Sequence, residues 1–215
     1  MIEVEQRLQQ LTNAILTGNP EEAKQKTHAA LAIVKPNEVL DAVIEAVNIL
    51  LDLNEVGGID QSRLTSLENT VNGPLQVLEP TLITTEGKFD FTATVGPLGF
   101  QGGHLLSTVL AALLRSVGFK SISLGKTQTA LEILRNSEEL RADIVIPILP
   151  KDELATHLTN LRDLIQKGGF SSKFQVIPIA RGLSESINVP LYAARSIDEA
   201  ISKALEWAIK NSVAE

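Results

Sequence analysis

The sequence predicts an α/β protein in which an N-terminal four-helix bundle precedes a doubly wound, parallel, five-stranded domain. Two observations lead to this prediction. In residues 1–78 the apolar residues recur only at helical spacing, whereas beyond residue 91 short apolar runs alternate with amphipathic stretches. Residues 79–90 follow neither period. We therefore expect a linker there, between a helical domain at 1–78 and an α/β domain at 91–215.

Four amphipathic helices are predicted in the first domain. Asn19 and Asp60 stand where a capping side chain is expected before the second and fourth helices, and Gly57-Gly58 ends the third. Pro74 lies inside the fourth pattern and is expected to kink or divide that helix. The stripes expected to be buried comprise Val4, Leu8, Leu11, Ile15, Ala23, Ala30, Leu31, Val34, Val39, Leu40, Val43, Ile44, Val47, Leu50, Leu51, Leu64, Leu67, Val71, Leu75 and Leu78.

The second domain is predicted to alternate strands and helices. The strands are expected at "FTATV", "SISLG", "DIVIPIL", "QVIPIA" and "VPLYAA", and the helices at 103–117, 127–140, 151–167 and 196–211. A parallel sheet covered on both faces binds ligands beyond the carboxyl ends of its strands, where the strand order reverses. The loops expected at that edge are 96–103, 147–152 and 180–187.

Composition excludes several classes of function. A net charge of -7 argues against nucleic acid or an anionic membrane surface as a partner. The chain has no cysteine, which excludes disulfides, thiolate metal sites and cysteine nucleophiles. Three scattered histidines make a poor metal site, and no nucleophile–base pair emerges, so no catalytic or metal-ligating residue is predicted. The polar N-terminus and the lack of a long apolar run predict a cytoplasmic protein.

The stretch "TVGPLGFQGGH", residues 94–104, joins the first strand to the first helix of the second domain. It contains neither G-x-G-x-x-G nor a phosphate-loop pattern. Its glycines, at 96, 99, 102 and 103, are expected to let a ligand approach the backbone. The alternative is a tight turn that needs a positive φ.

This layout and three stretches resemble the corrinoid proteins of methyltransferase systems, which are related to the cobalamin-binding module of methionine synthase. The stretches are "LTNAILTGNPEEAKQKTHAAL", "LQVLEP" and "FTATVGPLGFQGGHLLSTVLAALLRSVGFKSISLG". The resemblance implies a flavodoxin- or Rossmann-like domain that binds cobalamin, with the helical bundle as a cap over the cofactor.

The family signature D-x-H-x-x-G is degenerate here. Its Asp falls on Leu98 and its His, the lower cobalt ligand of the family, falls on Phe100, whereas its final glycine is matched by Gly103. The resemblance therefore implies cobalamin bound base-off and His-off. His104 lies on the following helix and is expected to contact the cofactor tail or solvent rather than cobalt.

Other family positions are altered as well. The serine after the third strand falls on or near Ile148, and the Gly-Gly pair after the fourth falls in "IARG". The cofactor-binding residues implied by the resemblance are Leu98, Gly99, Phe100, Gly102, Gly103, His104, Ile148, Leu149, Ala180, Arg181, Gly182, Tyr192, Ala193 and, in the cap, Leu67, Thr70 and Val71.

The resemblance implies a non-catalytic carrier: a cofactor-bearing subunit that accepts a methyl group from one partner methyltransferase and passes it to another. O-demethylation of aryl methyl ethers is one such system within the family's range. The linker at 79–90 would then be the hinge on which the cap moves. Two alternatives remain open. One is a sensor that binds cobalamin or another tetrapyrrole, and the other is a degenerate scaffold that has lost cofactor binding.

Overall fold

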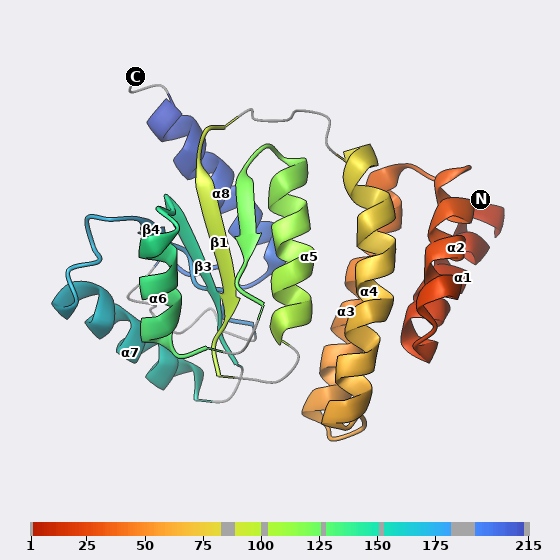
Figure 1. Ribbon diagram of the computed structural model, residues 1–215, viewed down its shortest axis with the longest axis horizontal. Helices are drawn as coiled ribbons and strands as arrows, with labels where there is room; N and C mark the ends of the chain where they lie inside the picture. Colours follow the sequence, from red (N-terminus) through yellow and green to blue (C-terminus); the bar gives the residue numbers. More distant parts are fainter. Residues whose placement is uncertain are drawn as a thin grey trace. The chain divides into compact units, whose positions relative to one another are not determined.

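The computed structural model describes residues 2–82, 89–99, 103–125, 128–150, 153–181 and 192–212. The chain divides into two compact units, Met1–Thr84 and Thr85–Glu215. The described part of the first unit is helical, whereas that of the second combines strands and helices (Figure 1).

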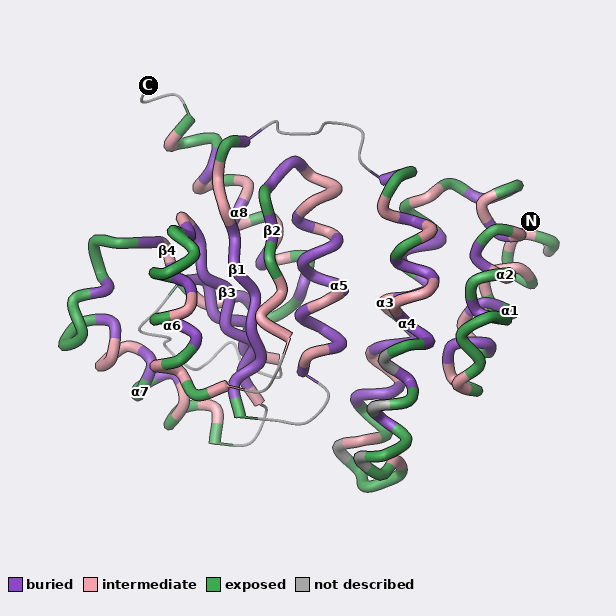
Figure 2. Tube along the Cα trace, viewed as in Figure 1, coloured by how far each residue is buried: buried purple, intermediate pink, exposed green. Residues whose placement is uncertain are grey.

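The first unit consists of α1 (Ile2–Thr17), α2 (Pro20–Leu31), α3 (Pro36–Glu55) and α4 (Gln61–Leu82). Each of these helices contacts at least two of the others. Most of their predicted inward stripes are buried, as the alternation along each helix in Figure 2 shows. The exceptions are Val4, Leu8, Leu31 and Ile44, which are partly exposed. A fully buried leucine such as Leu50 contributes about 1.5–3 kcal/mol through the removal of apolar surface from water.

The helix ends predicted at Asn19, Gly57 and Asp60 are confirmed. The Asn19 side chain accepts a hydrogen bond from the Glu22 N–H at 3.1 Å, and Asp60 accepts one from the Arg63 N–H at 2.8 Å. The Asn19 carboxamide and the Asp60 carboxylate each bind a backbone N–H of the first helical turn, which has no partner within the helix. Gly57 ends α3 with a φ of 72°.

Helix α4 differs from its prediction. It is not divided at Pro74 but continues to Leu82, into the segment expected to be a linker, with Pro74 and Pro80 inside it. The reason is tertiary packing. A Cβ on Gly73 would lie 3.5 Å from the Pro20 carbonyl oxygen, so α4 runs close against the start of α2 and is held by it. Such packing overrides local helix propensity.

The second unit contains a four-stranded sheet formed by β1 (Thr92–Pro97), β2 (Lys120–Ser123), β3 (Ile144–Ile148) and β4 (Gln175–Val176). The strand order is β2-β1-β3-β4 and every pairing is parallel. Helices α5 (Gly103–Ser116) and α8 (Ile197–Ser212) lie on one face, and α6 (Ala130–Glu139) and α7 (Leu154–Lys167) on the other (Figure 1). The predicted parallel, doubly wound architecture is confirmed.

Five strands were predicted, and the described residues contain four. At the fifth position, Ala194 forms only an isolated parallel bridge with Ile179, and residues 189–191 lie outside the described ranges. The Pro178 carbonyl accepts the Ala194 N–H, but proline has no N–H to return. Pro147 likewise faces β4 without a donor, which limits β4 to Gln175–Val176.

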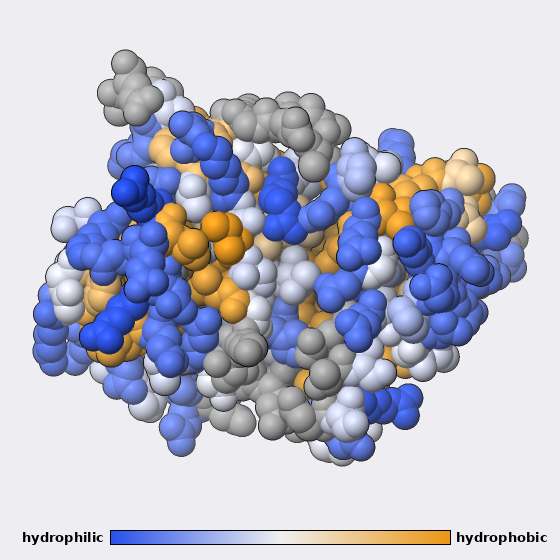
Figure 3. Space-filling view, in the orientation of Figure 1, coloured by the Kyte–Doolittle hydropathy of each residue, from blue (hydrophilic) through white to orange (hydrophobic). Residues whose placement is uncertain are grey.

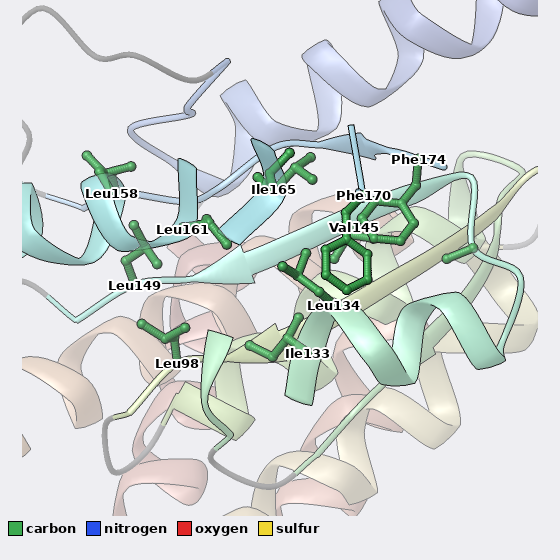
Figure 4. Close-up of a cluster of buried hydrophobic side chains, with 13 residues drawn as sticks. Leu98, Ile133, Leu134, Val145, Leu149, Leu158, Leu161, Ile165, Phe170 and Phe174 are labelled. Carbon is green, nitrogen blue, oxygen red and sulfur yellow. The ribbon is translucent and has the colours of Figure 1, made fainter. Parts of the chain in front are cut away.

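An apolar cluster lies between the sheet and the α6/α7 pair (Figure 4). Val145 on β3 faces Leu134 on α6 and Leu161 on α7, and Phe170 stacks on Phe174 with ring centroids 5.9 Å apart. Leu98, directly after β1, closes the cluster at the carboxyl end of the sheet. This end of the sheet therefore rests on a packed core.

The view in Figure 3 is mainly hydrophilic, with apolar residues in separate groups. None of the described helices combines the length and the apolar character needed to span a membrane. The large apolar side chains that are exposed are Ile33, Leu53, Val56, Ile122, Leu140, Tyr192 and Ile209.

Candidate functional site

The candidate site begins where β1 and β3 end. After β1 the chain crosses to β2 on one side, and after β2 it crosses to β3 on the other, so the strand order reverses between β1 and β3. A crevice at such a point is the usual ligand site of an open parallel sheet. Here the Leu98 N–H donates to the Ile148 carbonyl at 2.8 Å and holds the two strand ends together.

The glycines of the loop do not share one role. A Cβ on Gly96 would lie 3.1 Å from Leu124 Cδ1 and 3.3 Å from Ile133 Cγ1, so Gly96 makes room for core packing. The expectation that Gly96 admits a ligand is therefore wrong. Gly99 has a φ of 70°, and no atom lies within 4 Å of its Cβ position. It forms an open, left-handed turn. This conformation is consistent both with a glycine needed only for the turn and with a backbone that a ligand approaches.

Two of the predicted site residues lie at the start of α5. Gly103 is its first residue and is buried, and His104 is its second and is half-buried. Burial lowers the pKa of His104 below its ordinary value, so a neutral imidazole is favoured at neutral pH. Its carbonyl oxygen accepts hydrogen bonds from the Ser107 and Thr108 hydroxyls. Phe100 and Gly102 lie outside the described residues.

The positions aligned with the family's Asp and Ser are core positions here. Leu98, Ile148 and Leu149 are at most 4% exposed, and Leu98 and Leu149 belong to the cluster in Figure 4. The Leu149 N–H donates to the Ile179 carbonyl at 2.9 Å, so this backbone donor is already used within the protein. A polar side chain here would lose hydration without gaining a partner.

At the end of β4, the structure brings Ala180 next to the segment that leads into α8. The Ala180 N–H donates to the Ala194 carbonyl at 2.8 Å. The Tyr192 hydroxyl donates to Glu206 at 2.8 Å, which raises the pKa of Tyr192, and the Lys203 Nζ lies 4.6 Å from its ring centroid. Tyr192 is thus anchored on α8.

Three further residues complete this edge of the predicted site. Arg181 occupies a partly buried turn and Ala193 is partly buried, whereas Gly182 is outside the described residues.

The predicted cap residues Leu67, Thr70 and Val71 lie on α4 and are buried. Leu67 Cδ2 would be 3.3 Å from a Cβ on Gly18, so this side chain packs within the helical unit. The Thr70 hydroxyl has no hydrogen-bond partner among the described residues. These three residues belong to the first unit and the rest of the predicted set belongs to the second.

A cavity of about 620 Å³, which the sequence did not predict, lies between α6 and α7, beside the end of β1. One signal was present: His157, Asn160 and Leu164 recur at helical spacing and so share one face of α7. Among the residues described, no group of three or more His, Asp or Glu side chains could hold a metal ion. The cavity is lined by Leu98, Gly99, Gln128, Thr129, Ala130, Leu131, His157, Asn160, Asp163, Leu164 and Lys167.

No protein-family model matches the chain. Among curated proteins it is similar to UvrABC system protein B of Levilactobacillus brevis, with 26% identity over 194 residues. That alignment includes 88% of this chain, which spans only 28% of the length of that relative.

Among solved structures, the chain is similar to the monomethylamine corrinoid protein of Methanosarcina barkeri, with a TM-score of 0.67 at 15% identity over 92% of this chain and 96% of that one. This likeness confirms the predicted fold in outline. Lower TM-scores, 0.48 and 0.47, relate it to the methanol:cobalamin methyltransferase complex MtaBC of M. barkeri and to a cobalamin-binding protein of Desulfitobacterium hafniense. These have 14% and 12% identity and match 95% and 93% of this chain, and 80% and 98% of their own chains.

Proposed function

We propose that this chain is a corrinoid-binding methyl carrier that holds cobalamin base-off and His-off and serves partner methyltransferases. The observation that carries the proposal is the fold it shares with a monomethylamine corrinoid protein over 92% of its length. The sequence resemblance in the loop after β1 supports it independently. O-demethylation remains a candidate system within this proposal.

The apolar character of the described residues at the strand edge supports a corrinoid held by apolar and backbone contacts. Leu98 stands at the position of the family's Asp and is buried in apolar surroundings. Gly99 leaves open space above its backbone. When bound, the corrinoid would supply the metal centre that accepts and releases the methyl group, and the protein would supply binding and orientation.

Each part of the strand edge has a distinct task in this proposal. Leu98 and Leu149 exclude water from below, and Gly99 and Gly103 let the backbone come close. Neutral His104 can accept a hydrogen bond from an amide. The other residues proposed to contact the corrinoid in the second unit are Phe100, Gly102, Ile148, Ala180, Arg181, Gly182, Tyr192 and Ala193.

Reconstitution with hydroxocobalamin tests the proposal. The full chain is expected to keep the visible absorption of the corrinoid through gel filtration. After reduction to Co(II), electron paramagnetic resonance is expected to show no nitrogen superhyperfine splitting. Splitting that disappears in His104→Phe would overturn the His-off state and identify His104 as the ligand.

A scaffold that binds no cofactor is the second candidate function. Burial of Leu98, Ile148 and Leu149 favours it, because the family's polar contacts are replaced by packed core side chains. A colourless protein with an intact circular dichroism spectrum would overturn the carrier proposal and support the scaffold.

A further inference from the structure

The cavity between α6 and α7 has the properties of a small-molecule site. Its volume of about 620 Å³ lies within the range of roughly 300–1,000 Å³ that is typical of ligand pockets. It opens beside Leu98 and Gly99, at the carboxyl end of β1. Neither the sequence resemblance nor the similar proteins assign a ligand to it.

The floor of the cavity is apolar. Leu98 is buried in the cluster of Figure 4, and Ala130, Leu131 and Leu164 pack against that cluster while remaining partly exposed. These three side chains are therefore apolar surface that the core leaves uncovered. A ligand with a hydrocarbon body would remove it from water.

The α6 side of the rim has little hydrogen-bonding capacity left. Thr129 and Glu132 form a reciprocal capping box, in which each side chain accepts the other's backbone N–H. The Gln128 side chain accepts a hydrogen bond from Asn136 and donates one to the Leu124 carbonyl. A polar head group would therefore find its partners on α7.

The α7 side of the rim carries the charged groups of the cavity. Asp163 accepts hydrogen bonds from Arg162 at 2.9 Å and 3.1 Å and from Lys167 at 3.1 Å. These two cations hold the pKa of Asp163 below its ordinary value. Asp163 and Lys167 line the cavity whereas Arg162 does not, so Lys167 is the cation among the described lining residues. His157 and Asn160 line the same wall and offer further hydrogen-bonding groups.

We propose that this cavity binds an apolar monocarboxylic acid, with its hydrocarbon body on Ala130, Leu131 and Leu164 and its carboxylate at Lys167. Leu98 and Gly99 border both this cavity and the proposed corrinoid site, but the residues proposed to hold the acid, Ala130, Leu131, Leu164 and Lys167, belong to the cavity alone. Because Lys167 is exposed, its charge contributes modestly, and binding weakens as salt rises.

Titration of the full chain with octanoate tests the ligand class. Isothermal titration calorimetry at low salt is expected to detect binding of octanoate, weaker binding of octanol and no binding of octylamine. Lys167→Gln is expected to weaken octanoate binding about two- to fivefold, as befits one exposed charge. Lys210→Gln on α8 is the matched control and should leave the affinity for octanoate unchanged. Equal affinity for the acid and the amine would overturn the proposal.

A pair of alanine substitutions tests the location. Ala130→Phe fills the cavity from the first turn of α6 and is expected to abolish octanoate binding. Ala155→Phe places the same ring on the exposed part of the first turn of α7, outside the cavity lining, and should have no effect. Octanoate binding that survives both Ala130→Phe and Lys167→Gln would contradict the proposal even if one variant folds poorly.

Hydroxocobalamin separates this proposal from the carrier function. Ala130→Phe is expected to retain the corrinoid as wild type does, and octanoate should not displace it. Competition between the two ligands would overturn the claim of a second site. A protein that binds octanoate but stays colourless would refute the carrier function and leave the cavity proposal standing.

Discussion

At Gly99 the backbone conformation and the side-chain space can be tested separately. The residue has a φ of 70° and nothing within 4 Å of its Cβ position, so a methyl group there meets only backbone strain. Gly99→Ala is expected to lower the free energy of unfolding by about 1–2 kcal/mol, measured by urea denaturation. Gly99→Asn should cost less, because asparagine tolerates the left-handed region.

Gly169 is a matched control for Gly99, since it has a φ of 73° and equally open surroundings. Gly169→Ala should lower stability by the same amount. A much larger loss in Gly99→Ala alone would contradict the open turn. If Gly99 belongs to the corrinoid site, only its variant should also weaken hydroxocobalamin binding.

His104 should give stability a pH dependence of definite sign. Burial lowers its pKa in the folded state, so below about pH 6.5 the unfolded chain takes up the proton more readily. The free energy of unfolding should therefore fall as pH drops from 7.5 through this region, and it should fall less in His104→Gln. Parallel slopes in the wild type and in His104→Gln would rule out the His104 contribution.

Some residue roles could be predicted from the sequence and others could not. The capping roles of Asn19 and Asp60 were predictable because a cap binds an N–H three residues away. The packing role of Gly96 was not, because it depends on Leu124 and Ile133, which the fold brings to β1 from far along the chain.

Between elements, a buried pair of hydroxyls joins β1 to α6. Thr94 and Ser137 share a hydrogen bond of 2.7 Å, and Ser137 also donates to the Ile133 carbonyl. Ser137→Ala would leave the Thr94 hydroxyl with only a long contact to the Ile144 carbonyl, at 3.5 Å. Ser137→Ala should therefore cost about 1–3 kcal/mol of unfolding free energy, and Thr94→Val should cost less, because Ser137 keeps its bond to the Ile133 carbonyl.

The double variant of this pair should cost less than the sum of the two single variants, because no buried hydroxyl is then left without a partner. Thermal or urea unfolding of the wild type, the two single variants and the double variant gives the coupling free energy between Thr94 and Ser137. Strict additivity would show that the hydrogen bond between the two side chains contributes nothing of its own.

Proline shows why element boundaries were harder to predict than element types. Pro74 was expected to kink or divide α4, yet the helix is not divided there, because α2 packs closely at Gly73. Pro147 and Pro178, by contrast, shorten the pairing on both sides of β4. The same residue type was harmless in one element and disruptive in another, and the deciding neighbour was remote in the sequence each time.

At the scale of the whole molecule, the two compact units allow their stabilities to be followed separately. Trp207, the single tryptophan, packs edge-on against Phe91 at 5.0 Å and reports on the second unit. Leu50→Ala in α3 removes a fully buried side chain and should destabilise the first unit by about 2–5 kcal/mol. Far-UV circular dichroism should then show an earlier transition, while the tryptophan fluorescence transition stays in place.

The matching substitution for this experiment is Leu161→Ala in α7, which is also fully buried. It should shift the fluorescence transition. If both variants shift both signals together, the two units unfold as one.

The sequence located the strand-edge positions of the candidate site but not the cavity. Parallel strands bring their carboxyl ends to one edge whatever lies between them, so the ends of β1, β3 and β4 were predictable. The α6/α7 cavity depends on where two helices from separate crossovers diverge. Hydrophobic periodicity contains no information about that spacing.

The burial of Leu98 has a consequence for protein engineering. Leu98→Asp would insert a carboxylate into the apolar cluster that contains Val145, Leu149 and Leu161, which disfavours the charged form. The acid would then be neutral, or the core would open. A designer who wants to graft an imidazole ligand onto this scaffold must first rebuild the α6/α7 layer with a polar partner for position 98.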